Sequence, residues 1–109
     1  MNDLLNGVTA LTLKEYTQAA EKYGVRHNSS HEAYSVILEE LEEAEDIMTA
    51  VKRDLRECWQ LIKSDSIDTI WELDYFGGIR NNAERVAAEM IQVAAMCHKA
   101  TKGFGENDR

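Results

Sequence analysis

The chain has 109 residues, of which 44% are hydrophobic and 29% are charged, and its formal net charge is -8 at pH 7. This composition is typical of a globular domain and excludes wholesale disorder. The 20 acidic residues against 12 basic ones argue against binding of a nucleic acid duplex through its phosphates. An anionic nucleotide remains compatible with this charge if divalent cations lie between the nucleotide and the protein.

The length predicts a single domain over residues 1–109, with a frayed tail at 103–109. No segment resembles a signal peptide or approaches the roughly 18 apolar residues of a membrane span, so we expect a cytoplasmic protein without membrane contact. Cys58 and Cys97 lack metal-ligand spacing and fall on apolar helix faces. They are therefore predicted to be reduced residues of the core.

The first half of the chain predicts two helices. A Thr-x-x-Glu capping box at Thr12 and a left-handed stop at Gly24 predict a first helix over 13–23. A second capping box at Ser29 opens a stretch without glycine or proline that reaches about Lys63. This second helix has more than thirty residues and a length of about 50 Å at 1.5 Å per residue.

The second half predicts a short helix or turn over 67–73 that ends at Gly77 and Gly78. A last helix is expected from Asn82 to Gly103, with apolar residues at helical spacing. The predicted fold is therefore all-α, an antiparallel helical bundle with one very long helix.

The long helix carries an apolar seam with alternating steps of three and four residues, which is the heptad spacing. The first helix is too short to cover this seam, and Trp59 lies beside it. We therefore predict that association into a homodimer or homotetramer completes the bundle, the alternative being that the short third segment and the last helix cover the seam. The seam consists of Tyr34, Ile37, Leu41, Ala44, Met48, Val51, Leu55, Cys58 and Ile62.

An acidic run, with six acids among the eight residues 39–46, lies on the long helix. Its like-charge pairs cost on the order of 1–3 kcal/mol before solvent screening, which a solvated helix face can tolerate. At 100° per residue, however, Glu40 and Glu43 lie on one flank of the seam, and Glu89 and Gln92 lie on the same flank of the last helix. Antiparallel packing of the two helices is expected to bring these four side chains to a common groove.

Clustered acidic oxygens are the ligands that Mg²⁺ and Mn²⁺ prefer. The pattern therefore predicts a site for one or more Mg²⁺ or Mn²⁺ ions. Arg85 and Lys99 continue the same stripe on the last helix and are candidates for binding substrate phosphates, the alternative being ordinary solvated side chains. The predicted metal ligands are Glu40, Glu43, Glu89 and Gln92.

The motif Glu39-Glu40-x-x-Glu43 followed by Glu89-x-x-Gln92 resembles that of the all-helical MazG-like nucleoside triphosphate pyrophosphohydrolases, Glu-Glu-x-x-Glu and Glu-x-x-Asp. With the residues 31–38 and 87–100, the resemblance covers roughly half of the chain. It implies a helical bundle of several subunits, with Mg²⁺ bound by Glu40, Glu43 and Glu89. It also implies hydrolysis of a nucleoside or deoxynucleoside triphosphate to the monophosphate and pyrophosphate.

The sequence departs from this family in two respects. Gln92 replaces an aspartate, which exchanges an anionic ligand for a neutral one, and the gap between Glu43 and Glu89 is longer than usual in the family. Two hypotheses therefore remain. The chain is either a divergent pyrophosphohydrolase or a non-catalytic helical assembly or regulatory protein that has lost the second metal site.

Overall fold

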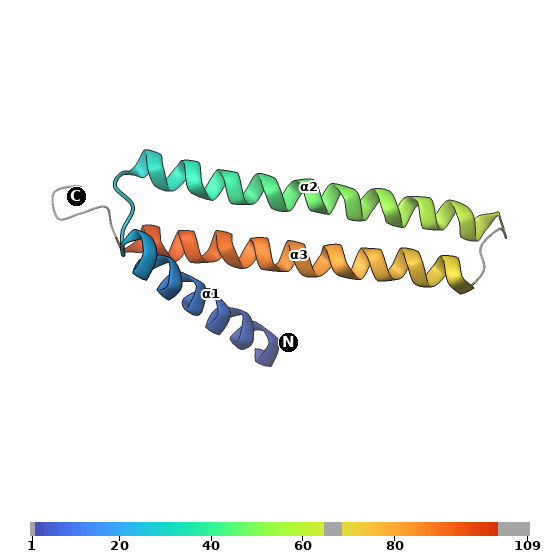
Figure 1. Cartoon of the computed structure of the whole chain (residues 1–109), viewed down its shortest axis with the longest axis horizontal. Coiled ribbons are helices and arrows are strands. Elements are labelled where there is room, and N and C mark those ends of the chain that lie inside the picture. The colour runs from blue at the N-terminus through green and yellow to red at the C-terminus, as the bar shows by residue number, and fades with distance from the viewer. Residues whose placement is uncertain (1, 65–68, 103–109) are drawn as a thin grey trace. The chain divides into compact units, whose positions relative to one another are not determined.

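The computed structural model describes residues 2–64 and 69–102, with the side chains of 69–73 left out. These residues form three helices, α1 (Asn2–Tyr23), α2 (Ser30–Lys63) and α3 (Thr69–Thr101), as Figure 1 shows. The described ranges contain no strand, so the predicted all-α class is confirmed. The expected tail at 103–109 and the residues 67 and 68 of the predicted short segment lie outside the described residues.

The chain divides into two compact units. The first unit comprises residues 1–42 and 89–109, and the second unit comprises residues 43–88. Helix α1 belongs wholly to the first unit, whereas α2 and α3 contribute a segment to each. Within each unit, the α2 and α3 segments lie side by side and run in opposite directions, in agreement with the predicted antiparallel packing (Figure 1).

Helix α1 starts at Asn2, so the predicted start at residue 13 is wrong. Thr12 is an interior residue whose hydroxyl donates a hydrogen bond to the Val8 carbonyl (3.0 Å), and it caps nothing. The helix continues through Gly7 because one interior glycine costs only about 1 kcal/mol. The predicted stop at Gly24 is confirmed, since this residue has a φ of 95° and its N–H donates to the Ala20 carbonyl (2.9 Å).

Helix α2 has the predicted bounds. The Ser29 hydroxyl oxygen accepts a hydrogen bond from the backbone N–H of Glu32 (3.1 Å), which is the expected N-cap. The helix ends at Lys63, as expected from the absence of any earlier breaking residue.

Helix α3 replaces both the short segment and the last helix of the prediction. It runs without interruption from Thr69 to Thr101, so the predicted end at Gly77 and Gly78 and the predicted start at Asn82 are wrong. Neither glycine has a positive φ, and both are exposed. The two glycines therefore weaken the helix without ending it.

The apolar seam of α2 is only half covered. One line of the seam, at a spacing of seven residues, faces inward: Ile37 and Val51 are half-buried, and Ala44 and Cys58 are buried. The residues of the other line are exposed, except for the half-buried Leu41. Trp59, beside this second line, is 54% exposed, as the sequence predicts. The exposed members are Tyr34, Met48, Leu55 and Ile62.

The two cysteines differ in environment. Cys58 is fully buried, as predicted, but Cys97 is exposed, so its assignment to the core is wrong. Cys97 directly follows the buried Met96, and consecutive helical residues point in directions 100° apart. No helix formed by the described residues has the length and apolar character needed to cross a membrane.

Candidate metal site and adjoining cavity

Two of the predicted metal ligands meet within the first unit. Glu40 comes from α2 and Glu89 from α3, and a carboxylate oxygen of one lies within 4.8 Å of a carboxylate oxygen of the other. Both side chains are half-buried. The antiparallel packing of the two helix segments thus brings together two carboxylates that are 49 positions apart in the sequence.

Glu89 carries an unsatisfied oxygen. Its Oε2 atom is buried and accepts no hydrogen bond from any residue that the structure describes. Leaving a buried acceptor without a donor costs about 1–3 kcal/mol, and more when the group is charged. A cation bound between Glu89 and Glu40 would offset this cost and the repulsion between the two carboxylates.

Gln92 lies one turn after Glu89 on α3 and is held by the first helix. Its Nε2 donates a hydrogen bond to Oε2 of Glu15 on α1 (3.0 Å). This bond orients the amide group, because the nitrogen faces Glu15 and only Oε1 remains as an acceptor. Gln92 can therefore offer a neutral oxygen as a ligand.

A cavity of about 360 Å³ adjoins this site within the first unit. Small-molecule sites usually measure about 300–1,000 Å³, so this cavity suits a ring or a small part of a ligand. Three predicted site residues line it, namely Glu40, Gln92 and Lys99. The remaining lining residues are Ala19, Tyr23, His27, Glu32, Val36 and Met96.

Lys99 is only 5% exposed, so the alternative of a solvated side chain is wrong. Lys99 lines the cavity together with Glu32 and Glu40, and its ammonium group can only donate hydrogen bonds. This part of the cavity therefore suits a ligand that offers a hydrogen-bond acceptor.

His27, in the loop between α1 and α2, is also buried and lines the cavity. Its Nε2 lies 3.2 Å from the Met96 carbonyl, which can only accept, so Nε2 carries a hydrogen. Its Nδ1 is buried and makes no hydrogen bond with the described residues, although Oε1 of Glu32 lies 3.8 Å away. In the neutral imidazole, Nδ1 is thus a buried acceptor.

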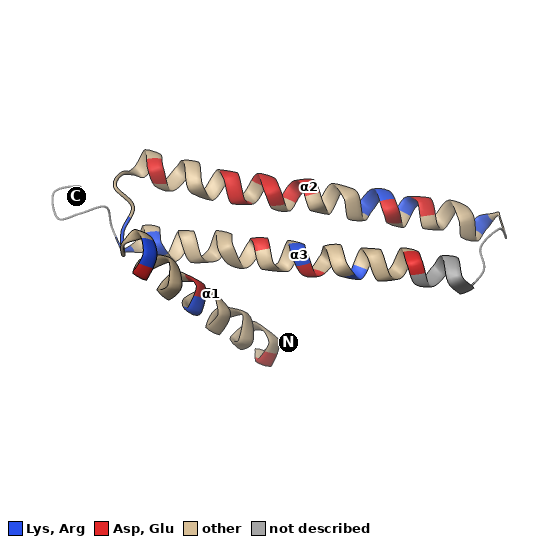
Figure 2. Cartoon of the chain, viewed as in Figure 1, with Lys and Arg blue, Asp and Glu red and all other residues tan. Residues whose placement is uncertain are grey.

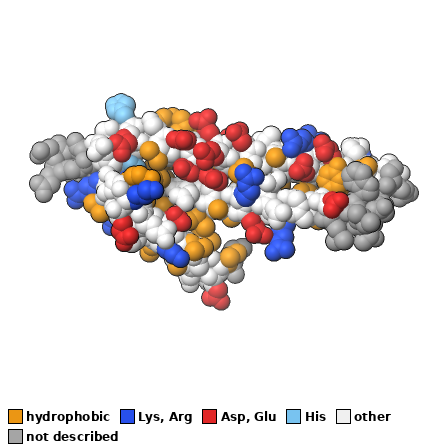
Figure 3. All heavy atoms as spheres, in the orientation of Figure 1, with side chains coloured by type: hydrophobic (Ala, Val, Ile, Leu, Met, Phe, Trp, Pro, Cys, Tyr) orange, Lys and Arg blue, Asp and Glu red, His pale blue; other side chains and the backbone are white. Residues whose placement is uncertain are grey.

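The other two predicted site residues belong to the second unit. Glu43 is exposed and follows Glu40 by three residues on α2, a spacing that places the two on the same side of a helix. Arg85 is exposed, and its Nη1 donates to Oδ1 of Asn82 (3.4 Å). Figure 2 shows the acidic run in red along α2, and Figure 3 shows acidic side chains gathered on one face of the molecule.

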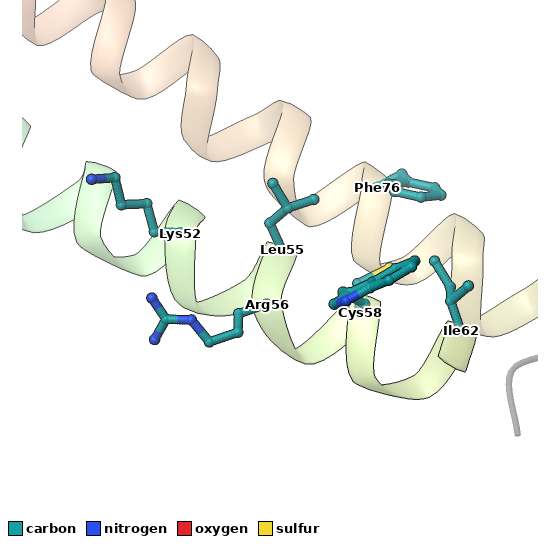
Figure 4. Close-up of a pocket in the computed structure, with 7 residues that line it drawn as sticks. Lys52, Leu55, Arg56, Cys58, Ile62 and Phe76 are labelled. Atoms are coloured by element: carbon teal, nitrogen blue, oxygen red, sulfur yellow. The ribbon is translucent and has the colours of Figure 1, made fainter. Parts of the chain in front are cut away.

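A second cavity, of about 670 Å³, lies within the second unit. Its apolar lining includes Leu55, Trp59 and Phe76, each about half exposed, and the buried Cys58. In Figure 4, Lys52 and Arg56 extend along α2 away from Phe76 of α3. We call this surface the α2–α3 groove; it is lined by Lys52, Leu55, Arg56, Cys58, Trp59, Ile62 and Phe76.

Several residues of the site and of the first cavity have no functional signature in the sequence. The sequence predicts Glu15 and Glu32 only as parts of capping boxes and Tyr23 only as the last residue of the first helix, and no pattern singles out His27. Their roles depend on how α1 and the following loop pack against α3, and no local pattern reports that packing.

Comparison with known proteins provides no relative of this chain. No protein family, no curated protein and no solved structure matches it.

Proposed function

We propose that this protein is a divergent MazG-like pyrophosphohydrolase that converts a nucleoside or deoxynucleoside triphosphate and water to the monophosphate and pyrophosphate. The observation that carries the proposal is the close approach of Glu40 and Glu89, with a buried Glu89 oxygen that has no hydrogen-bond donor among the described residues. Paired carboxylates next to a cavity of ligand size suit a metal-dependent reaction of a nucleotide.

In this proposal, Glu40, Glu43 and Glu89 hold Mg²⁺ or Mn²⁺, and Gln92 adds its neutral Oε1. Bound Mg²⁺ neutralises phosphate charge and lowers the pKa of a coordinated water. The hydrogen bond from Gln92 to Glu15 fixes the amide, so that its oxygen is presented in one orientation. The nucleoside part of the substrate occupies the cavity beside Glu40.

Arg85 and Lys99 have different roles in this proposal. Arg85 is exposed and remains a candidate for binding phosphate oxygens. Lys99 is buried inside the cavity and is better suited to contact the nucleoside.

The purified chain, incubated with a panel of nucleoside triphosphates with and without Mg²⁺, tests the proposal. We expect Mg²⁺-dependent release of pyrophosphate and a thermal stabilisation by Mg²⁺, which amounts to about 2.7 kcal/mol at a concentration 100-fold above the Kd. Glu89→Gln should abolish both effects. Glu39→Gln, at an exposed position of the same acidic run, is the matched control and should retain both.

Failure to release pyrophosphate from any nucleotide, together with an unchanged melting temperature on addition of Mg²⁺ or Mn²⁺, would remove the enzymatic proposal. The second hypothesis, a non-catalytic assembly protein, would then account for the acidic run as a solvated face.

We also propose that subunits associate through the α2–α3 groove. Leu55 and Trp59 are each about half exposed there, and adjacent exposed apolar side chains of this size commonly mark interaction surfaces. Charge supports a second copy as the occupant. In the second unit, α2 carries Glu43, Glu45 and Asp46 at one end, and nearer the other end Lys52 and Arg56 line the groove, whereas Arg53 pairs with Asp54 (3.5 Å). Two antiparallel copies would bring Lys52 and Arg56 of each copy toward the acidic end of the other.

A further inference from the structure

The first turns of α1 are exposed throughout. Every residue from Asn2 to Leu11 is exposed, whereas Thr12 and Glu15, further along the same helix, are half-buried. Most of the stability of a helix in a protein comes from packing of its apolar face, and the interior Gly7 weakens these turns further. A partner that packs against residues 2–11 would therefore stabilise them.

One side of these turns is apolar. At 100° per residue, Leu4, Val8 and Leu11 fall within a sector of about 60°, which we call the α1 stripe. Asp3 is the single charged residue among residues 2–13, although 29% of the whole chain is charged. An exposed helix face with this composition is typical of an interaction surface.

Two charged residues flank the α1 stripe on the same side. From the centre of the stripe, Asp3 lies at about 110° and Lys14 at about 90° in the same direction. Within the residues that the structure describes, neither of them forms an ion pair. Since same-side flanks meet when two helices pack antiparallel, two copies of α1 would place each Asp3 against Lys14 of the partner subunit. Val8 would then lie close to the two-fold axis.

We propose that two copies of this chain pair antiparallel through their α1 stripes. The surface is self-complementary, as an isologous contact requires, because each copy offers the same apolar residues and one charge of each sign. A lipid surface fits less well. Helices that lie on anionic membranes carry Lys or Arg on their polar face, and residues 2–13 contain neither.

This contact is distinct from the α2–α3 groove, because α1 belongs to the first unit and the groove to the second. Helix segments this short bury less than the roughly 800 Å² per partner of a standard stable interface. The α1 contact therefore strengthens the association of subunits without holding a dimer alone. It does not depend on the proposed hydrolysis.

Disulfide trapping of the full chain tests the contact. The exposed Cys97 is first changed to serine, and the buried Cys58 is kept. Val8→Cys should then form a disulfide-linked dimer under mild oxidation, because the two copies of position 8 lie near the axis. Leu13→Cys is the matched control. Position 13 is also exposed but lies about 170° from the centre of the stripe, and a disulfide requires Cα atoms within about 7 Å, so this variant should stay monomeric.

Charge exchange in the Val8→Cys chain tests the register of the pair. Asp3→Lys and Lys14→Asp each place like charges opposite one another at two symmetric positions, and each should slow the crosslinking at least about threefold. The double variant Asp3→Lys with Lys14→Asp restores both ion pairs and should restore the rate. All the substituted positions of α1 are exposed, and melting temperatures establish that the variants are folded.

Crosslinking at position 8 that is no faster than at position 13 would overturn the proposal, whatever else covers the α1 stripe. A double charge variant that crosslinks as slowly as the single variants would overturn it as well. Trapping accumulates even a weak contact and needs no nucleotide, so its failure would leave both the α2–α3 groove and the proposed hydrolysis intact.

Discussion

Gln92 donates a hydrogen bond from Nε2 to Oε2 of Glu15, and this 3.0 Å contact joins α1 to the candidate metal site on α3. The Glu15 carboxylate can only accept hydrogen bonds, so its partner must be a donor such as the N–H of an amide. The contact thus explains how an amide is accommodated where the MazG-like motif has an aspartate. An aspartate at position 92 would face a second carboxylate.

Gln92→Asp, which makes the sequence match the MazG-like motif that it resembles, is therefore expected to destabilise the metal-free protein. It removes a hydrogen bond to a charged group, worth about 1.5–3 kcal/mol, and places a carboxylate near Glu15. With Mg²⁺, the added anionic ligand should increase the metal-dependent stabilisation above that of the unchanged protein. Thermal denaturation with and without Mg²⁺ measures both effects.

The double variant Gln92→Asp with Glu15→Gln provides the control. An amide at position 15 can donate to the new carboxylate, so the metal-free stability should largely return. A single Gln92→Asp variant that is as stable as the unchanged protein would contradict the role assigned to the Glu15 contact.

Replacement of the two glycines within α3 by alanine is expected to stabilise the folded protein. A Cβ atom added at Gly77 or Gly78 meets no atom within 4 Å, and neither residue has a positive φ. Each change to alanine should therefore stabilise the protein by about 0.5–1 kcal/mol, measured by chemical denaturation. Gly24→Ala provides the contrast, because its φ of 95° should make the same change cost about 1–2 kcal/mol. Loss of stability at positions 77 and 78 would indicate that α3 is interrupted there.

Deprotonation of Tyr75 is expected to lower the stability of the folded protein at alkaline pH. Its pKa is raised above the usual value of 10.0 by desolvation and by the negative charge of Glu57, whose Oε2 accepts a hydrogen bond from the phenol (3.5 Å). The folded state holds this proton more tightly than the unfolded state. The contribution to stability is therefore complete below pH 10 and decreases as the pH rises from 10 through the pKa of the folded state.

Tyr75→Phe removes this titration, so its stability should decline less than that of the unchanged protein as the pH rises above the usual tyrosine pKa of 10.0. Chemical denaturation at several pH values compares the two proteins. Identical pH profiles would show that the phenol titrates alike in the folded and unfolded states.

The α2–α3 groove predicts self-association. We expect sedimentation of the unchanged chain to give a mass above the 12.4 kDa of one subunit, increasing with concentration. The double variant Leu55→Gln with Trp59→Gln should sediment as a monomer, because it removes the two half-exposed apolar side chains. Val25→Gln changes an exposed apolar residue outside the groove and should leave the association intact. A monomeric unchanged protein would refute the proposed interface.

Features encoded by neighbouring residues could be predicted from the sequence. The N-cap at Ser29, the stop at Gly24 and the end of α2 at Lys63 depend on local hydrogen bonding and backbone conformation. The approach of Glu40 to Glu89 followed from helical periodicity combined with antiparallel packing.

Features that depend on competition between local and tertiary energies could not be predicted. The capping box at Thr12 matched a motif, but the helix continues through it. Gly77 and Gly78 matched a helix end, yet the cost of about 1 kcal/mol for each glycine does not interrupt α3. The burial of His27 depends on a contact with Met96, 69 residues away.

Helix α1 has no buried residue along its whole length, although it provides the acceptor for Gln92. Its other described link to α3 is an edge-on contact between Tyr16 and His98, with ring centroids 4.7 Å apart. Elements with few buried contacts open at a low free-energy cost, so the amide protons of α1 should exchange with solvent sooner than those of α2. Each such opening releases the Gln92 side chain, and the rate at which the site rearranges is therefore tied to local unfolding of the first helix.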